Sequence, residues 1–366
     1  MRAACEVAEV LQHLGSGMEG MGLDTHQLRT LRAIEYCRTP ALGGHVDVCE
    51  DCAVIKISYN SCRNRHCPKC QGHKREEWIQ KRTADLLPVP YFHVVFTLPD
   101  TIHALALHKP SVVYDALFKA AWQTIHQFAS GKGMQGGMIA VLHTWGQSLT
   151  LHPHLHCIVP GAGVNANGLL KTITPNGKYL FPAKAMSKVY RAKYVALLRQ
   201  NGITDRILIE KLFAKDWVVY AKRPFGGPGQ VIEYLGRYTH KIAISNHRLL
   251  NVDDTHTTFN YKDYKDKGCT KTLSLSNGEF VRRFAQHILP LRFVRIRHYG
   301  ILSSTWKRTK FVELRKRLKI PVIKIDMKTK LHCCPSCKTG KLVTIMFFGT
   351  RGPPESYKAD EKRNAC

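Results

Sequence analysis

Two pairs of cysteines in the first quarter of the sequence have the spacing of metal ligands. Cys49-x2-Cys52 is followed, after fourteen residues, by Cys67-x2-Cys70. Two closely spaced thiol pairs separated by a loop can place four thiolates tetrahedrally around one zinc ion. We therefore predict a structural Zn²⁺ site formed by Cys49, Cys52, Cys67 and Cys70.

Other possible ligands surround these pairs, so a second ion or a mixed ligand set stays open. They lie inside or just before the same segment: Cys37, His45, Cys62 and His66. A further pair, Cys334-x2-Cys337, has His332 and Cys333 beside it. Because no partner pair follows it, this segment is half a site and only weak evidence for another zinc ion.

Alternating histidines mark a second candidate metal site. In Leu151-His152-Pro153-His154-Leu155-His156 the histidines are two residues apart. Alternate residues of a β-strand share a face, so His154 and His156 can direct both imidazoles at one ion. We predict His143 as the third ligand, because a hairpin could bring it beside His154. Gln147, His152 and His240 are the alternatives.

Two tyrosines four residues apart are candidate nucleophiles. On a helix, Tyr234 and Tyr238 would share a face, and both hydroxyls could reach one site. Arg237, His240 and Lys241 make their surroundings basic, which stabilises a phenolate and attracts phosphate. An aromatic stripe in the core is the alternative interpretation.

Together these groups predict phosphoryl-transfer chemistry. A divalent ion held by histidines polarises a scissile phosphate and stabilises charge on its oxygens. A tyrosine oxygen attacks the phosphorus and leaves a phosphotyrosine bond and a free 3′-hydroxyl. Rejoining then needs no ATP, since the bond energy is kept. A second tyrosine allows a second exchange.

Five ordered segments carry a family resemblance: YNSCRNRHCPKCQ (59–71), FTLP (96–99), HPHLHCIVPG (152–161), YLGRYTHKIAIS (234–245) and FVRRFAQHILPLRFVRIRHYG (280–300). Together they resemble the bacterial rolling-circle transposases of the insertion-sequence-ninety-one family. Those proteins are HUH endonucleases with two tyrosines and an N-terminal zinc-binding domain. The resemblance covers roughly residues 25–345.

The resemblance implies both a fold and site roles. It implies an α+β fold with an HUH-type central antiparallel sheet flanked by helices, in which the FTLP strand is structural. It places the metal pair at His154 and His156 and the nucleophiles at Tyr234 and Tyr238. The implied activity is cleavage and rejoining of single-stranded DNA at transposon ends and target through a 5′-phosphotyrosine intermediate. The implied cofactors are structural Zn²⁺ and catalytic Mg²⁺ or Mn²⁺.

Charge also indicates a nucleic-acid partner. The 366 residues hold 55 Lys and Arg against 27 Asp and Glu, a net charge of +28. Residues 282–319 hold twelve basic side chains and one acid, Glu313, interleaved with Phe284, Phe293, Tyr299 and Trp306. Such a block can bind phosphates and stack bases, or its aromatic residues can anchor packed elements. The predicted DNA-binding residues are Arg63, Arg65, Arg237, Lys241, Arg282, Arg283, Arg292, Arg295 and Arg297.

Composition bears on the compartment. No run of 18 apolar residues exists, and the N-terminus lacks a secretion signal. The thirteen cysteines are an odd number in a long chain, which favours metal binding in a reducing cytosol over disulfides. We expect a cytoplasmic, nucleoid-associated protein with no membrane partner and possible homo-oligomerisation.

The elements that would position these residues follow from periodicity and turn signals. Helices are expected over 23–38, with Asp24 or Thr25 as N-cap, and over 73–87, 111–129 and 183–200. Strands are expected over 89–100, 138–151, 152–163 and 216–224, the middle two pairing antiparallel. Residues 231–245 start helical and end strand-like.

We expect three consecutive domains. Residues 1–87 form a helical and zinc-binding domain, residues 88–280 the endonuclease domain, and residues 281–366 a basic DNA-contacting region and tail. Two other functions remain open. One is a plasmid- or phage-type replication initiator or relaxase. The other is a non-catalytic zinc-ribbon DNA-binding regulator in which the histidines and tyrosines are core residues.

Overall fold

The computed structural model describes residues 3–70, 86–173, 180–222, 241–319 and 333–357, together with residues 79, 230 and 236. The helix expected over 73–87 and the segment expected over 231–245 fall mostly outside these ranges. None of the helices in the described part of the chain is long and apolar enough to cross a membrane.

The chain divides into two compact units, each built from separate stretches of sequence. The terminal unit combines Met1–Lys74, Ile244–Ile288 and Asp326–Cys366, and the sheet unit combines Arg75–Ala243 and Leu289–Ile325. This division differs from the three consecutive domains expected. The C-terminal strand pairs with the N-terminal one, which brings the end of the chain back to its beginning.

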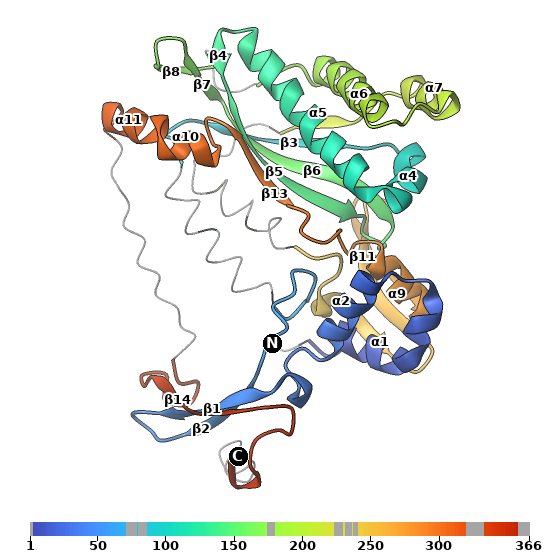
Figure 1. The fold of residues 1–366 in the computed structure, drawn as a ribbon, viewed down its shortest axis with the longest axis vertical. Helices are drawn as coiled ribbons and strands as arrows, with labels where there is room; N and C mark the ends of the chain where they lie inside the picture. Colours follow the sequence, from blue (N-terminus) through green and yellow to red (C-terminus); the bar gives the residue numbers. More distant parts are fainter. Residues whose placement is uncertain are drawn as a thin grey trace. The chain divides into compact units, whose positions relative to one another are not determined.

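The sheet unit is built around five antiparallel strands in the order β13-β5-β6-β3-β9 (Figure 1). Its strands and helices are β3 (Tyr91–Thr97), α4 (His103–His108), α5 (Pro110–Ser130), β4 (Met134–Gln135), β5 (Gly137–Trp145), β6 (Leu151–Pro160), β7 (Ala162–Asn165), β8 (Leu170–Thr172), α6 (Ala183–Gln200), α7 (Arg206–Ala214), β9 (Val219–Ala221), β13 (Ile296–Gly300), α10 (Ser304–Arg308) and α11 (Lys310–Arg317). The α+β class with antiparallel sheets is confirmed, as is the pairing of the histidine strand with the strand before it.

One face of this sheet packs against helices, and we call it the helix face. Figure 1 shows α5 lying along the sheet, with α6 beside it. Alternate residues of β3 enter this core, namely Phe92, Val94 and Phe96, and Leu155 of β6 enters it as well. Because side chains alternate across a strand, the residues between them point to the opposite face. The apolar runs of these strands therefore fix which residues face away from α5.

The opposite face carries a second, smaller cluster. Tyr91, Ile139 and Ile158 pack there with Phe311 and Leu314 of α11. This packing explains part of the apolar content of the basic block. Its aromatic residues anchor packed elements: Phe284 and Phe293 are buried, and Tyr299 stacks on Trp122 with ring centroids 5.3 Å apart.

The terminal unit contains two three-stranded sheets, β14-β1-β2 and β10-β11-β12. Its elements are α1 (Val7–Leu14), α2 (Thr25–Glu35), β1 (Gly44–Cys49), β2 (Ile55–Tyr59), β10 (Leu249–Val252), β11 (His256–Asp263), β12 (Cys269–Ser276), α9 (Asn277–Ala285) and β14 (Leu342–Phe348). Asp24 caps α2 in a capping box with Gln27, which confirms one of the two expected N-caps.

The last residue of the edge strand β13 must be a glycine, because the backbone at Gly136 lies too close for a side chain. Gly300 has φ +57°, and a Cβ there would lie 2.0 Å from the backbone oxygen of Gly136. We predict that Gly300→Ala lowers the free energy of unfolding by about 1 kcal/mol for its positive φ and by roughly 1–3 kcal/mol more for the clash.

Gly133→Ala is the matched control, since Gly133 has φ +67° but open space around it. Gly133→Ala should lower the free energy of unfolding by only the roughly 1 kcal/mol expected for a positive φ. Denaturant unfolding measures this quantity for both variants. Equal losses in the two variants would show that the close approach at Gly300 is unimportant.

Candidate functional site

Three histidines meet on the face of the central sheet that points away from α5 and α6. His143 of β5 lies directly opposite His154 of β6 in the antiparallel register, and Val141 lies opposite His156. The neighbours of these histidines, Leu142 and Leu155, enter the helix-face core. The strand pleat therefore brings three imidazoles from two strands to one place, and their ligand nitrogens all lie within 4.8 Å of one another.

Hydrogen bonds orient two of these imidazoles. Nδ1 of His154 lies 2.6 Å from the carbonyl oxygen of His152. A carbonyl only accepts, so Nδ1 of His154 carries the proton and its Nε2 keeps a lone pair. Nε2 of His154 lies 3.2 Å from Nε2 of His156. Either a proton from His156 or a shared cation must lie between these two nitrogens.

A fourth histidine, which the sequence analysis missed, supports the group from the next strand. Nε2 of His93 in β3 lies 2.9 Å from Nδ1 of His156, and the two rings stack with centroids 5.1 Å apart. His93 is 3% exposed. Its place between Phe92 and Val94, two residues of the helix-face core, was the available signal. The strand period puts it on the histidine side of the sheet.

His93, His154 and His156 are uncharged at neutral pH. Burial lowers the pKa of His154 to about 4 and that of His156 well below its ordinary value, and the positive charge of Lys241 adds to both shifts. Burial also lowers the pKa of His93 to about 4. Neutral imidazoles offer lone pairs to a divalent ion, so the residues present fit a metal.

The two candidate nucleophiles lie outside the described residues, as do Arg237 and His240. Lys241, three residues after Tyr238, is described and exposed. Its charge lowers the pKa of both His154 and His156, so Lys241 itself lies within electrostatic range of the histidine group. Of the alternatives considered as third ligand, His152 has an exposed side chain and does not belong to the group of converging nitrogens among the described residues.

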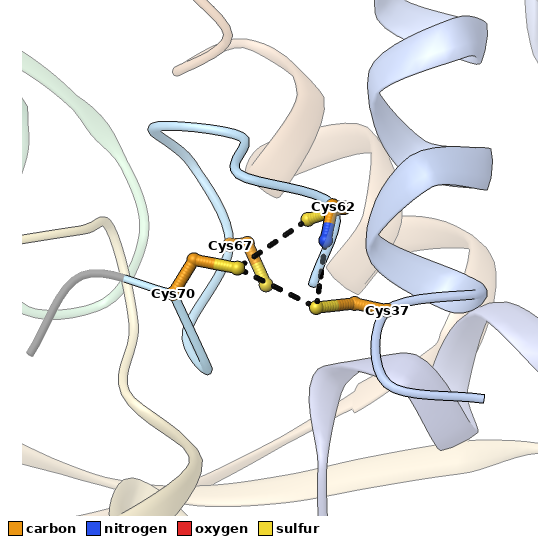
Figure 2. A group of neighbouring side chains, drawn as sticks. All are labelled: Cys37, Cys62, Cys67 and Cys70. Atoms are coloured by element: carbon orange, nitrogen blue, oxygen red, sulfur yellow. Dashed lines mark hydrogen bonds between the residues drawn. The ribbon is translucent and has the colours of Figure 1, made fainter. Parts of the chain in front are cut away.

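A first cysteine cluster forms in the terminal unit from Cys37, Cys62, Cys67 and Cys70 (Figure 2). Cys37 follows the end of α2, and the other three come from the loop after β2. The sulfur of Cys70 lies 3.5 Å from that of Cys37 and 3.6 Å from that of Cys62. The backbone N–H of Cys62 donates to the Cys37 sulfur.

A second cysteine cluster gathers Cys49, Cys52, Cys334 and Cys337. The grouping predicted from sequence is therefore wrong as a single site, because Cys49 and Cys52 belong to one cluster and Cys67 and Cys70 to another. Spacing suggested that neighbouring pairs combine. The fold instead gives each predicted pair partners from elsewhere in the chain.

The chemistry of these clusters fits zinc. Four sulfurs about 2.3 Å from a central Zn²⁺ lie roughly 3.8 Å from one another, whereas disulfide sulfurs are about 2.05 Å apart. Hydrogen bonds from the thiols of Cys62 and Cys67 lower the pKa of Cys37, and the Cys37 sulfur raises the pKa of Cys62 to about 12. Ionisation of one thiol thus makes ionisation of its neighbour less favourable. Four thiolates can coexist here only with a cation among them.

The predicted DNA-binding arginines fall into different environments. Arg63 and Arg292 are exposed, Arg65 is half-buried, and Arg295 is buried. Arg282 and Arg283 both form ion pairs with Glu279. Arg297 pairs with Asp115 at 2.5 Å and lies 4.2 Å from the centre of the Phe118 ring. These contacts give Arg297 a packing role that the charge count did not predict.

Known proteins resemble the chain over nearly its whole length. A family model described as "Putative transposase" matches residues 137–310, and one described as transposase zinc-binding domain matches residues 9–98. The chain is 38% identical to "Putative transposase y4qJ" of Sinorhizobium fredii, over 97% of this chain and 99% of that protein. It is 27% identical to the transposase for insertion sequence element IS801 of Pseudomonas savastanoi pv. phaseolicola, over 78% of this chain and 73% of the relative.

No solved structure matches the chain. The sequence relatives are decisive, because the match to the Sinorhizobium protein spans both the zinc-binding segment and the histidine strands. The chain belongs to the insertion-sequence-ninety-one (IS91) family of transposases and carries that family's N-terminal zinc-binding domain.

Proposed function

We propose that this transposase cleaves and rejoins single-stranded DNA at the ends of a mobile element through a 5′-phosphotyrosine intermediate. The observation that carries the proposal is the convergence of His143, His154 and His156 on one face of the central sheet. A non-catalytic regulator gives no reason for three imidazoles, two of them buried and one half-buried, to converge. The family membership favours transposition over plasmid-type replication initiation.

His143, His154 and His156 would hold the divalent ion. That ion supplies charge stabilisation for the oxygens of the scissile phosphate. Three imidazoles are softer ligands than the oxygens that Mg²⁺ prefers, so we expect Mn²⁺ to bind more tightly than Mg²⁺. The sheet contributes by fixing both strands, so the ligand nitrogens are held in place before DNA arrives.

Tyr234 and Tyr238 would supply the nucleophilic oxygens. Chain connectivity supports this role: Tyr238 precedes Lys241 by three residues, which span at most about 11 Å. Lys241 lies within electrostatic range of the histidines. Attack by a phenolate oxygen forms the tyrosine–phosphorus bond, and the bond to the 3′ oxygen breaks to leave a 3′-hydroxyl. The basic residues around the tyrosines lower the cost of the phenolate.

His93 would act as the positioning residue that prepares His156 for metal. When Nε2 of His156 binds an ion, its proton must be carried on Nδ1. Nε2 of His93, 2.9 Å away, is placed to accept a hydrogen bond from that Nδ1–H. Such outer partners fix the tautomer and the ring orientation of a ligating histidine.

In the terminal unit, Cys37, Cys62, Cys67 and Cys70 would bind one structural zinc. Arg63 and Arg65 lie on the same loop, which supports contact between this module and DNA phosphates. Function on DNA agrees with the expected location of the protein at the bacterial nucleoid. A complex of two copies holding two DNA ends would suit the reaction.

The tyrosine assignment predicts a covalent product. Incubation with labelled single-stranded DNA carrying element ends and Mn²⁺ should yield a protein–DNA adduct that survives denaturing electrophoresis. The double variant Tyr234→Phe plus Tyr238→Phe should form none, and His154→Ala should slow adduct formation roughly 100-fold or more. Tyr264→Phe is the matched control, because Tyr264 is 72% exposed in the terminal unit. Adduct from the double variant would refute the assignment.

His93 should affect metal binding through its ring nitrogen. We predict that His93→Phe, which keeps an aromatic ring, weakens Mn²⁺ binding about 10- to 100-fold. His93→Gln, which restores an acceptor, should recover much of that loss. Isothermal titration calorimetry measures both. If Phe and Gln weaken binding equally, His93 contributes only packing.

Phosphate contact at Lys241 should appear in the salt dependence. Each phosphate contact on single-stranded DNA contributes a slope of about −0.7 to log K against log salt. Lys241→Ala should reduce the slope by about that amount. Lys265→Ala removes another exposed charge, from the turn after β11, and should leave the slope unchanged. Fluorescence anisotropy over a salt series would contradict the contact if both variants kept the parental slope.

A further inference from the structure

The second cysteine cluster joins two parts of the chain that lie far apart in sequence. Cys49 ends β1 and Cys52 lies in the turn between β1 and β2, whereas Cys334 and Cys337 precede β14. The matched zinc-binding segment ends at residue 98 and so contains only the first pair. We infer that these four cysteines bind a second zinc ion, which fastens the segment Cys333–Phe348, including β14, to the turn between β1 and β2. The inference does not rest on the proposed DNA cleavage.

The sulfurs are arranged as two pairs facing each other. The Cys49 sulfur lies 3.7 Å from that of Cys337, and the Cys52 sulfur lies 3.7 Å from that of Cys334. Both distances join one pair to the other, and both are close to the roughly 3.8 Å edge of a tetrahedron of sulfurs around zinc. They are too long for disulfides.

The two Cys-x2-Cys segments have the same backbone turn. In each, the residue after the second cysteine has a positive φ: Ala53 at 54° and Lys338 at 64°. The backbone N–H of Ala53 donates to the carbonyl oxygen of Cys49, and that of Lys338 to the carbonyl oxygen of Cys334, each at a distance of 3.0 Å. Residues other than glycine rarely adopt this backbone conformation without a compensating interaction. The repeated turn puts both sulfurs of each segment on the same side, where one ion can reach them.

Gly340 shows that the two segments must approach closely. A Cβ at this position would lie 2.4 Å from the Cys49 sulfur and 2.9 Å from Cβ of Asp51. The N–H of Gly340 also donates to the Cys337 sulfur over 3.2 Å. A backbone N–H directed at sulfur stabilises the thiolate, the form in which cysteine binds metal.

Within the described residues, the segment Cys333–Phe348 has little buried apolar packing around its cysteines. Among the described residues, Cys49, Cys334 and Leu342 form a small buried cluster with Cys337 packed against it, and Phe348 adds an edge contact to Tyr59. Along β14, Val343, Ile345 and Phe347 are exposed, the last by 81%. Phe347 still contacts His45, with ring centroids 6.2 Å apart, but most of its surface is in solvent. Small elements with so little core need a metal or a disulfide to be stable.

The consequence is that Cys334 and Cys337 complete a zinc site to which the β1–β2 turn contributes Cys49 and Cys52. The ion closes a loop from Cys52 to Cys334, and the residues of the sheet unit, Arg75–Ala243 and Leu289–Ile325, lie within that loop in sequence. The chain that enters the sheet unit at Arg75 and the chain that leaves it at Ile325 would thus both connect to segments that bind the same zinc ion.

Metal analysis of the full chain provides the test. After dialysis against a weak chelator that strips the histidine site, inductively coupled plasma mass spectrometry should find two zinc ions per chain. Cys334→Ser plus Cys337→Ser should retain one, and Cys37→Ser plus Cys62→Ser should also retain one. Cys333→Ser is the matched control and should retain two, since the Cys333 sulfur donates instead to the carbonyl of Lys338 over 3.1 Å. Two zinc ions in the Cys334/Cys337 variant would overturn the inference.

Thiol labelling of the unmodified protein tests the same site without a variant that could misfold. In the zinc-loaded chain, Cys49, Cys52, Cys334 and Cys337 should resist N-ethylmaleimide, while Cys333 reacts. A strong chelator should expose all four together. Labelling of Cys334 and Cys337 as fast as Cys333 would contradict the site, as would protection that survives chelation and yields only to a reductant.

Discussion

The alternation of side chains across β3, β5 and β6 is the constraint on which the candidate site depends. Leu142 and Leu155 must enter the core beneath α5, so His143, His154 and His156 must point the other way. A one-residue slip in register would reverse every side chain and bury imidazoles among leucines. The same packing that stabilises the sheet therefore also selects the face on which the histidines meet.

That arrangement separates stability from chemistry. The helix face is closed by aliphatic and aromatic packing and needs no ion. On the other face, His154 is held by the carbonyl of His152 and His156 by His93, so the two nitrogens 3.2 Å apart are oriented before any ion is bound. Burial keeps the imidazoles uncharged. A cation between these two nitrogens would take the place of the proton that otherwise joins them.

Local sequence patterns predicted the elements that depend on local interactions. The helix expected over 183–200 matches α6, and the helix expected over 111–129 matches α5 within a residue at each end. The Asp24 cap was predictable because it depends only on the first turn of α2. The hairpin that pairs His143 with His154 was predictable because only a short connection separates its strands. His93 was missed because it precedes His156 by 63 residues, and no local sequence pattern indicates which distant strands become neighbours.

The cysteines show the same limit. Spacing predicted zinc from two neighbouring pairs, and both pairs do lie in four-cysteine clusters. The clusters combine residues as far apart as Cys49 and Cys337, however, because β14 returns to pair with β1. Partners at such a separation are set by the whole fold, and the order of the pairs along the chain cannot reveal them. The basic block illustrates a similar effect, since Arg297 is engaged by Asp115 and Phe118.

The claim that His143, His154 and His156 hold the divalent ion is tested most directly by pulsed electron paramagnetic resonance on the protein loaded with one equivalent of Mn²⁺. We predict electron–nuclear couplings from imidazole nitrogens, lost stepwise when each of the three histidines is replaced by alanine. A bound Mn²⁺ whose spectrum shows no nitrogen couplings, or keeps them in all three variants, would contradict it.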